Sequence, residues 1–433
     1  MAEELKRLIR KVTPLRASSF VKAKDETFSR MEALDERIAG LEAQLDVLEG
    51  QIEALSLAQL RGYEALSKSN DALAKMLKDN SRFDRIEKRL AKLSEASAKT
   101  DELVCQGNQA FQRHLDWGKL EAEYRRLANG RPIWAIECPA PGTEEARRWG
   151  DYGFAISLKK SLERLGLFVV IDTRESWDFE AYADVVVVLR GARFFRPDRR
   201  AASTRYVMWN ISHPDMVSDS EYELYDAVCV ASMSYAKEVA ERVTVPVFPL
   251  LQCTDTDLFH PAEEAESPRW DYIFIGNSRG VARQSVMWAI EDNLPLRMWG
   301  SGWNKILADH MDLFEAPTIA NGDIPDVYRR SRVTINDHWA DMLEKQFVNN
   351  RIFDALACGL PVISDTFDEL RTLFPSAVLH YSNRAEFEDC VRRIESDYDA
   401  VKQEVEAQWP LIQSEFSFDR RAAQLKSIVD SLG

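Results

Sequence analysis

The stretch that decides the fold is QFVNNRIFDALACGLPVISD, which runs from Gln346 to Asp365. Apolar residues at helical spacings predict a helix over 347–358, and Gly359 ends it because glycine tolerates a positive φ. The apolar run 360–364 then predicts a buried parallel strand. A helix that leads directly into such a strand is the repeating unit of an α/β sheet.

Polar side chains gather at the predicted start of this helix, which pure packing does not require. They are Gln346, Asn349, Asn350 and Arg351. The unpaired N–H groups of a helix start favour anions. Further along the helix, Asp354 supplies a carboxylate that can accept two hydroxyl groups. The pattern therefore indicates a ligand-binding end of the helix.

This stretch resembles the nucleotide-sugar signature of GT-B glycosyltransferases of the class called glycosyl transferases group 1. That family carries Glu-x7-Glu followed by Ala-x-Ala-x-Gly-x-Pro-Val-Ile. Asp354 matches the second acidic residue, which in the family holds the ribose hydroxyls of the donor. Gln346 stands where the family has its first Glu, which contacts the donor sugar. The variant Arg-x-Phe-Asp-Ala-x-Ala-x-Gly looks closer to the CgeB-like branch of the same fold.

Composition limits the class of protein. With 433 residues, 45% of them hydrophobic, the chain should hold two or three domains with sizeable cores. Its net charge of −15 argues against nucleic-acid binding, which depends on neutralising phosphates. No apolar run reaches the ~18 residues of a membrane span, and no signal peptide is visible. We therefore expect a cytoplasmic protein whose six cysteines are buried free thiols.

The N-terminal segment, 1–128, differs from the rest of the chain. Residues 1–24 are basic and carry an apolar stripe, which indicates either peripheral contact with the inner face of a membrane or a solvated helix end. Apolar residues at alternating spacings of three and four then predict a long coiled coil and a homo-oligomer through 27–105. A parallel coil with a stutter and a hairpin turning near 60–70 both fit this pattern. The first seam positions are Met31, Leu34, Ile38, Leu41, Leu45, Leu48, Ile52 and Leu55.

Strands alternate with helices from Asn129 onward, which predicts parallel sheets with helices on both faces. Together with the resemblance, this alternation predicts two Rossmann-like domains, 129–257 and 258–416, that face a cleft in the GT-B manner. The resemblance implies that a last helix, 417–433, crosses back to the first domain. The expected strands are 133–136, 167–171, 184–189, 206–211, 227–231 and 245–250, then 272–275, 296–300, 333–335, 360–364 and 378–381.

A nucleotide-sugar site is expected in the second domain. Gly276 follows a strand and lets the backbone approach a ligand, and Arg279 offers a planar guanidinium for a diphosphate. The family has a Lys five residues after this Arg; here that position is Gln284, and Arg283 is the nearest cation. The predicted donor-binding residues are Gly276, Asn277, Arg279, Arg283, Gly300, Trp303, Asn336, His338, Gln346, Asn349, Asn350, Arg351 and Asp354.

Two residues of the first domain are candidates for catalysis. Asp151 lies in a Gly-rich turn before the first helix, where it could cap the helix or serve as a base. His213 follows an apolar strand and could exchange a proton near pH 7. The triplet Asp255-Thr256-Asp257 imitates a metal-binding Asp-x-Asp, but it falls in the linker between the domains, so we expect no metal site.

The resemblance implies a metal-independent glycosyltransferase that moves a sugar from a nucleoside diphosphate to a glycan, lipid-linked or protein acceptor, in bacterial surface polysaccharide or glycoconjugate synthesis. No cofactor is expected beyond the donor substrate. Gln346 and Gln284 keep a second hypothesis open, an inactive scaffold that assembles partners through its coil. A third, epimerase-like hypothesis lacks evident paired carboxylates.

Overall fold

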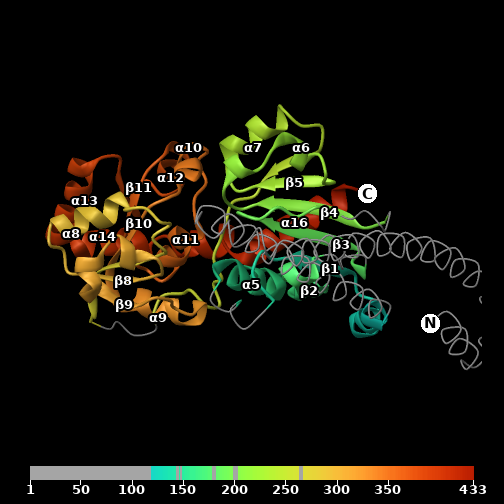
Figure 1. Cartoon of the computed structure of the whole chain (residues 1–433), viewed down its shortest axis with the longest axis horizontal. Coiled ribbons are helices and arrows are strands. Elements are labelled where there is room, and N and C mark those ends of the chain that lie inside the picture. Colours follow the sequence, from blue (N-terminus) through green and yellow to red (C-terminus); the bar gives the residue numbers. More distant parts are fainter. Residues whose placement is uncertain (1–118, 143–145, 147–148, 178–181, 198–202, 263–266) are drawn as a thin grey trace, which may run out of the picture. The chain divides into compact units, whose positions relative to one another are not determined.

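The computed structural model describes residues 119–142, 146, 149–177, 182–197, 203–262 and 267–433 (Figure 1). All of them belong to one compact unit, Phe111–Gly433. The predicted basic segment 1–24 and the predicted coiled coil 27–105 lie outside the described residues. Residues 119–128 are helical and lead into the first strand.

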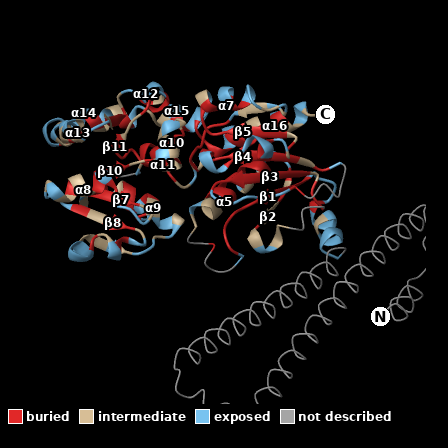
Figure 2. Cartoon of the chain, turned by 45° about the horizontal axis from the view of Figure 1, so that its top comes forward, coloured by how far each residue is buried: buried red, intermediate tan, exposed pale blue. Residues whose placement is uncertain are grey.

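The first sheet has six parallel strands in the order β2-β1-β3-β4-β5-β6. Most of its residues are buried, because helices and loops cover both faces of the sheet (Figure 2). The chain order changes direction between β1 and β3, which opens a crevice at the carboxyl edge. The strands are β1 (Ile133–Glu137), β2 (Phe168–Asp172), β3 (Val185–Arg190), β4 (Arg205–Asn210), β5 (Ala227–Val230) and β6 (Val247–Pro249).

The second sheet also has six parallel strands, in the order β12-β11-β10-β7-β8-β9. Here the chain order reverses between β7 and β10, so a second crevice opens at their carboxyl ends. The strands are β7 (Trp270–Ile275), β8 (Leu296–Trp299), β9 (Phe314–Ala316), β10 (Ser331–Asn336), β11 (Val362–Asp365) and β12 (Val378–Tyr381). Two parallel α/β sheets therefore confirm the predicted fold class.

Helices connect the strands and cover both sheets. They are α5 (Gly150–Arg164), α6 (Asp219–Tyr222), α7 (Met233–Ala240), α8 (Gln284–Glu291), α9 (Ile324–Arg329), α10 (Ala340–Glu344), α11 (Asn350–Ala357), α12 (Asp368–Leu373), α13 (Arg384–Ser396), α14 (Tyr398–Glu406), α15 (Trp409–Glu415) and α16 (Phe418–Ser431). Short 3-10 helices are η2 (Arg174–Ser176), η4 (Pro214–Met216), η5 (Trp303–Lys305), η6 (Ala308–Leu313) and η7 (Asn321–Asp323).

Helix α11 is the helix predicted from the opening stretch, but it starts at Asn350 rather than at Phe347. Phe347 is fully buried in a cluster with residues of the first sheet, and this packing keeps its segment extended. The helix ends as predicted: Gly359 has φ +71°, and the Leu360 N–H donates to the Ala355 carbonyl over 2.9 Å.

The chain crosses between the two sheets twice, and the two crossings pair with each other. Thr254 N–H donates to the Phe416 carbonyl over 2.9 Å, and Phe418 N–H donates to the Thr254 carbonyl over 3.1 Å. Ser417 caps α16 by accepting a hydrogen bond from the Arg420 N–H. Helix α16 then packs in the core of the first sheet, where the Phe418 ring meets the Phe154 ring of α5 at 4.6 Å.

The described cysteines, Cys138, Cys229, Cys253, Cys358 and Cys390, are all buried free thiols. Among the residues that the structure describes, no helix combines the length and the apolar character that a membrane crossing requires.

Candidate functional site

A cavity of about 680 Å³ lies between the carboxyl edges of the two sheets. The first sheet contributes the start of α5, and the second contributes the turns after β7 and β8 and the start of α11. Its lining includes Asp151, Gly276, Asn277, Gly300, Asn350, Arg351 and Asp354. A smaller cavity of about 160 Å³ is lined by Asp151, His213, Arg279, Asn349, Asn350 and Arg351, among others. Most of the predicted site residues therefore meet in one region.

The turn after β7 brings backbone to the cavity surface. A Cβ on Gly276 would lie 3.0 Å from the Arg351 guanidinium, so a larger residue would displace this cation. A Cβ on Gly300, which has φ +144°, would overlap the Gly276 carbonyl oxygen. Trp303 is buried behind this turn and donates its indole N–H to the same carbonyl over 2.9 Å. Trp303 thus shapes the turn from behind.

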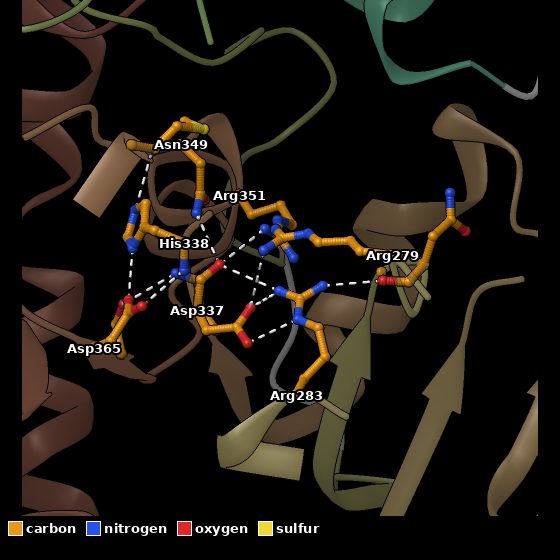
Figure 3. A network of polar contacts seen from close by, with 12 residues as sticks. Arg279, Arg283, Asp337, His338, Asn349, Arg351 and Asp365 are labelled. Carbon is orange, nitrogen blue, oxygen red and sulfur yellow. Dashed lines mark hydrogen bonds and ion pairs between the residues drawn. The ribbon is translucent and has the colours of Figure 1, made fainter. Parts of the chain in front are cut away.

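Three guanidinium groups converge beside this turn (Figure 3). Arg283 is paired with the Asp337 carboxylate and donates to the Asn277 carbonyl over 3.0 Å. Among the described residues, Arg351 donates to two backbone carbonyls and to no side chain: those of Ile275 over 3.2 Å and Asp337 over 3.1 Å. Within the described part of the chain, Asp337 is the single carboxylate within 4.0 Å of any of these guanidiniums.

Arg279 is the most available of the three cations. It has φ +63° and stacks on the Trp339 ring at 4.1 Å, and its nearest carboxylate oxygen, on Asp337, is 4.0 Å away. It makes no hydrogen bond to any described residue. Burial and the neighbouring Arg351 lower the pKa of Arg279 to about 9. An anion bound here would supply the missing negative charge.

His338 and Asn336 support the start of α11 from behind the cavities. The His338 Nδ1 lies 2.6 Å from Asp365 Oδ1, and its Nε2 accepts a hydrogen bond from the Asn349 N–H over 3.3 Å. Nδ1 therefore carries the proton, and His338, despite the opposing effect of burial, lowers the pKa of Asp365. Asn336 Oδ1 accepts from Asn349 Nδ2 over 3.1 Å.

Asn349 leaves one polar atom without a partner. Its Oδ1 is buried and accepts no hydrogen bond within the described residues, and the side chain lines the smaller cavity. A buried unsatisfied oxygen costs about 1–3 kcal/mol, which a ligand hydroxyl or amide at this place would recover.

Asp354 lies at the floor of the larger cavity and is only 6% exposed. Its two oxygens accept hydrogen bonds from Thr254 Oγ1 over 2.6 Å and from Asn350 Nδ2 over 3.1 Å. Burial raises the pKa of Asp354 to about 8. Each oxygen keeps a further lone pair for a ligand hydroxyl.

The first domain contributes two titratable side chains at its carboxyl edge. Asp151, in the first turn of α5, lines both cavities and has no hydrogen-bond or ion-pair partner among the described residues. Burial raises the pKa of Asp151 to about 6. His213 has φ +52°, its Nδ1 lies 3.6 Å from Asp341 Oδ2, and burial lowers the pKa of this imidazole.

Some predicted residues line neither cavity. These are Arg283, Trp303, Asn336, His338 and Gln346. Gln346 has φ +62°, and its Oε1 accepts the Glu369 N–H over 2.9 Å at the first turn of α12. The side chain that replaces the acidic residue of the signature is therefore engaged in a structural contact.

Other residues that shape the site were missed by sequence reasoning. Asp337 lies between two predicted residues, Asn336 and His338, so the strand end could have indicated it. No local pattern in the sequence could have indicated Thr254 or Asn321, because each forms its hydrogen bond with a residue far away in the sequence. Asn321 Nδ2 donates to the Trp149 carbonyl over 3.2 Å and joins the second domain to the turn before α5.

The linker triplet does not present its carboxylates to the cavity as a pair. Asp255 accepts from Ser157 Oγ over 2.7 Å, and Asp257 pairs with Arg164 over 2.9 Å. No group of three or more His, Cys, Asp or Glu side chains in the described residues is arranged to hold a metal ion.

Comparisons with known proteins agree with this architecture. Residues 283–427 match the model of the family described as "Glycosyl transferase-like". The alpha,alpha-trehalose 6-phosphate synthase from Burkholderia multivorans superposes with a TM-score of 0.51 at 8% identity, covering 70% of this chain and 100% of that chain. A search of curated protein sequences gave no match.

Two further solved structures align with this chain. AviGT4, a glycosyltransferase involved in avilamycin A biosynthesis, gives a TM-score of 0.49 at 13% identity over 68% of this chain and 96% of its own. Anabaena Alr3699/HepE, in complex with UDP and glucose, gives 0.48 at 11% identity over 70% and 100%. The second half of the chain therefore resembles the glycosyl transferase-like family, and the two parallel α/β sheets have the arrangement of the GT-B fold.

Proposed function

We propose that this protein transfers a sugar from a nucleoside-diphosphate sugar to a hydroxyl group of a glycan, lipid-linked or protein acceptor. One observation carries the proposal. Arg279 and Arg351 line a cavity at the start of α11, and among the described residues the Asp337 carboxylate, which is within 4.0 Å of Arg279 and Arg283, is the one carboxylate that close to the three guanidinium groups. Such a site has an excess of positive charge that suits a diphosphate.

The proposed reaction breaks the bond between the anomeric carbon and the diphosphate oxygen and forms a bond from that carbon to the acceptor oxygen. Negative charge develops on the leaving diphosphate while the sugar becomes cation-like. Stabilising that charge is the largest requirement. We assign this role to Arg279, Arg351 and the backbone N–H groups in the first turn of α11.

The remaining parts of the donor find partners in the same region. Asp354 offers its remaining lone pairs to the ribose hydroxyls, and the cavity extends from it to the turns at Gly276 and Gly300. The unsatisfied Oδ1 of Asn349 offers an acceptor for a sugar hydroxyl in the smaller cavity. Nucleotide and sugar would then occupy the larger and the smaller cavity respectively.

We assign to Asp151 the role of the base that removes the proton from the acceptor hydroxyl. It faces both cavities from the opposite domain, and a carboxyl group with a pKa of about 6 is ionised at pH 7. An inverting transfer requires one such base. A retaining transfer would use the diphosphate itself as the base and would leave Asp151 dispensable. His213 lines the smaller cavity, and we assign it a contact with the donor sugar there.

The N-terminal sequence adds a proposal about assembly. The apolar seam within 27–105 supports self-association, and the basic segment 1–24 supports peripheral contact with an anionic membrane surface that carries the acceptor, in bacterial surface glycan synthesis. Analytical ultracentrifugation of the full chain should show an oligomer. Replacing the seam residue Leu41 with Asp should shift the sedimenting species toward the mass of a single chain.

A non-catalytic scaffold is the second candidate function. The observation that favours it concerns Gln346, which stands at the position of an acidic residue in the family signature. Its side chain accepts a hydrogen bond from the first turn of α12. The scaffold hypothesis predicts that substituting Asp151 or Arg279 leaves assembly and partner binding intact, and that no donor is turned over.

A thermal-shift panel with UDP, GDP, CDP, dTDP and ADP tests the proposal, with Asp354→Ala as the control. A ligand at about one hundred times its dissociation constant adds ~2.7 kcal/mol to the stability of the folded state. One nucleotide should raise the melting temperature of the natural protein and not of the variant. The matching sugar nucleotide should then release nucleoside diphosphate in the presence of an acceptor. No shift with any nucleotide would contradict the proposal.

A further inference from the structure

One carboxylate of the second domain reaches a helix of the first domain. Glu369, in α12, accepts hydrogen bonds from the backbone N–H groups of Met233 over 2.9 Å and Ser234 over 3.3 Å. Its Oε2 also lies 3.2 Å from the Ser232 hydroxyl. These three residues form the start of α7, on the other side of the chain crossing.

The chemistry of this contact is that of a helix cap supplied from another domain. The N–H groups of Met233 and Ser234 have no partner within their own helix, because the first turn of a helix lacks preceding carbonyls. Ser232 is the N-cap and accepts the Tyr235 N–H over 3.1 Å. Glu369 is 8% exposed, so its carboxylate and these N–H groups satisfy each other away from water.

Gln346 connects this contact to the candidate site. Its Oε1 accepts the Glu369 N–H, which fixes the first turn of α12. The next residue, Phe347, is fully buried and lies 5.9 Å from the Tyr235 ring of α7. Three residues further along, α11 begins with Asn350 and Arg351. The start of α11 is therefore held against the first domain by both a polar and an apolar contact.

We propose that Glu369 is a positioning residue for sugar transfer: by capping α7 it holds the anion-binding start of α11 opposite Asp151. This inference rests on the proposed function. Glu369 touches neither cavity, so it acts through the placement of Arg351 and Asn349 relative to the first domain. The glutamine at position 346 then serves the reaction as the support of this contact.

The positions of these groups predict that kcat should change more than the donor KM. The groups proposed to bind the nucleotide part of the donor, Arg279, Arg351 and Asp354, belong to the second domain, and His213 alone is proposed to reach the sugar from the first. Most of the donor affinity should therefore survive a loss of interdomain alignment. Transfer also needs Asp151 of the first domain. A misplacement of about 1 Å between reacting groups can cost roughly 100-fold in rate.

Glu369→Gln keeps the shape of the side chain and removes its charge. The chain should remain folded, because the paired crossings at Thr254 and Ser417 and the Asn321–Trp149 contact still join the domains. Glu369→Asp keeps the charge, but its side chain is too short to reach α7, so this variant should also lose the contact between the two domains.

Glu223→Gln is the matched control. Glu223 also accepts a backbone N–H and a hydroxyl, both from Thr244 at 2.6 and 2.7 Å, but both residues belong to the first domain.

The experiment combines hydrogen exchange of the peptide 230–240 with steady-state kinetics on the donor found by the nucleotide panel. We expect Glu369→Gln and Glu369→Asp to speed exchange at Met233 and Ser234 and to lower kcat by about 10- to 100-fold with donor KM changed less than about threefold. Glu223→Gln should change neither.

Unchanged exchange in both Glu369 variants would overturn the interdomain contact. Faster exchange with an unchanged kcat, or a loss confined to donor KM, would overturn the positioning role while the contact stands. If the natural protein turns over no donor but the Glu369 variants exchange faster, the proposed function fails, and with it the positioning role, although the contact itself is real.

Discussion

Two sets of polar side chains beside the cavities are held differently. At the edge of the second sheet, Arg283, Asp337, His338 and Asn349 bond to one another and to the backbone in a dense network (Figure 3). At the edge of the first sheet, Asp151 faces the same cavities with no partner among the described residues.

From this difference we infer that the network at the second sheet binds the donor, whereas Asp151 takes part in the reaction. A hydrogen-bonded network of this kind is rigid, and a rigid support beside Arg279 and Arg351 favours the placement of a diphosphate. A base needs the opposite environment, because partners that favour its charged form would lower its pKa and its ability to take a proton. The predictions below test this contrast, beginning with the largest expected effect.

Asp151→Asn should lower kcat by about 10²- to 10⁴-fold, the usual contribution of a general base. The thermal shift produced by the nucleoside diphosphate should stay the same, since the proposed nucleotide contacts all lie in the second domain. Steady-state rates and melting curves of the same preparations measure both. Retention of most of the natural rate would show that the leaving diphosphate, rather than Asp151, takes the acceptor proton.

Arg279→Met should weaken nucleoside-diphosphate binding by about 10- to 100-fold, since a hydrogen bond to a charged group contributes about 1.5–3 kcal/mol. The fold should not suffer, because Arg279 makes no hydrogen bond to any described residue. Calorimetric titration with the nucleoside diphosphate and with the bare nucleoside measures the effect.

The nucleoside titration and a surface variant serve as controls for Arg279. Nucleoside affinity should be unchanged in Arg279→Met. Arg332→Met removes an arginine that pairs with Glu395 at 3.2 Å, away from both cavities, and should leave both titrations unaltered. An equal loss for nucleoside and diphosphate in Arg279→Met would place the phosphates elsewhere.

The pH dependence of transfer should report the pKa of Asp151. Burial raises this pKa from 3.8 to about 6, and only the ionised form can act as a base. The value of kcat/KM should therefore rise about tenfold between pH 5 and pH 7 and then level off. A pH profile of the natural enzyme with a saturating acceptor measures it, and a residual rate in Asp151→Asn that shows the same rise would assign the titration to another group.

Asp354→Asn should increase stability most at alkaline pH and progressively less as the pH falls toward 3.8. Burial raises the pKa of Asp354 from 3.8 to about 8, so the folded state holds a proton that the unfolded state releases. Stability falls as the pH rises through this interval, and a neutral amide avoids that loss. Scanning calorimetry should show a Tm a few degrees above that of the natural protein at pH 9 and a clearly smaller gain at pH 5. A gain of equal size at both values would point to packing instead of charge.

The strands and the α11–β11 unit could be predicted from the sequence because their signals are local. Buried parallel strands are short apolar runs, and Gly359 marks a helix end wherever the helix lies. Strand β9 was missed because three residues at the edge of a sheet carry no such pattern. The early start assigned to α11 was wrong because Phe347 has helical spacing but packs in a core of the other domain.

The polar partners were decided only by the tertiary structure. The sequence placed Arg279 at a strand end and Arg351 at a helix start that face a crevice, because parallel strands put those ends at one edge, and it placed Asp354 further along the same helix. It gave no sign that Thr254 would bond to Asp354 or that Gln346 would support Glu369. Local spacing determines which face of an element is buried, whereas the partner of a buried polar group depends on which distant segment the folded chain brings beside it.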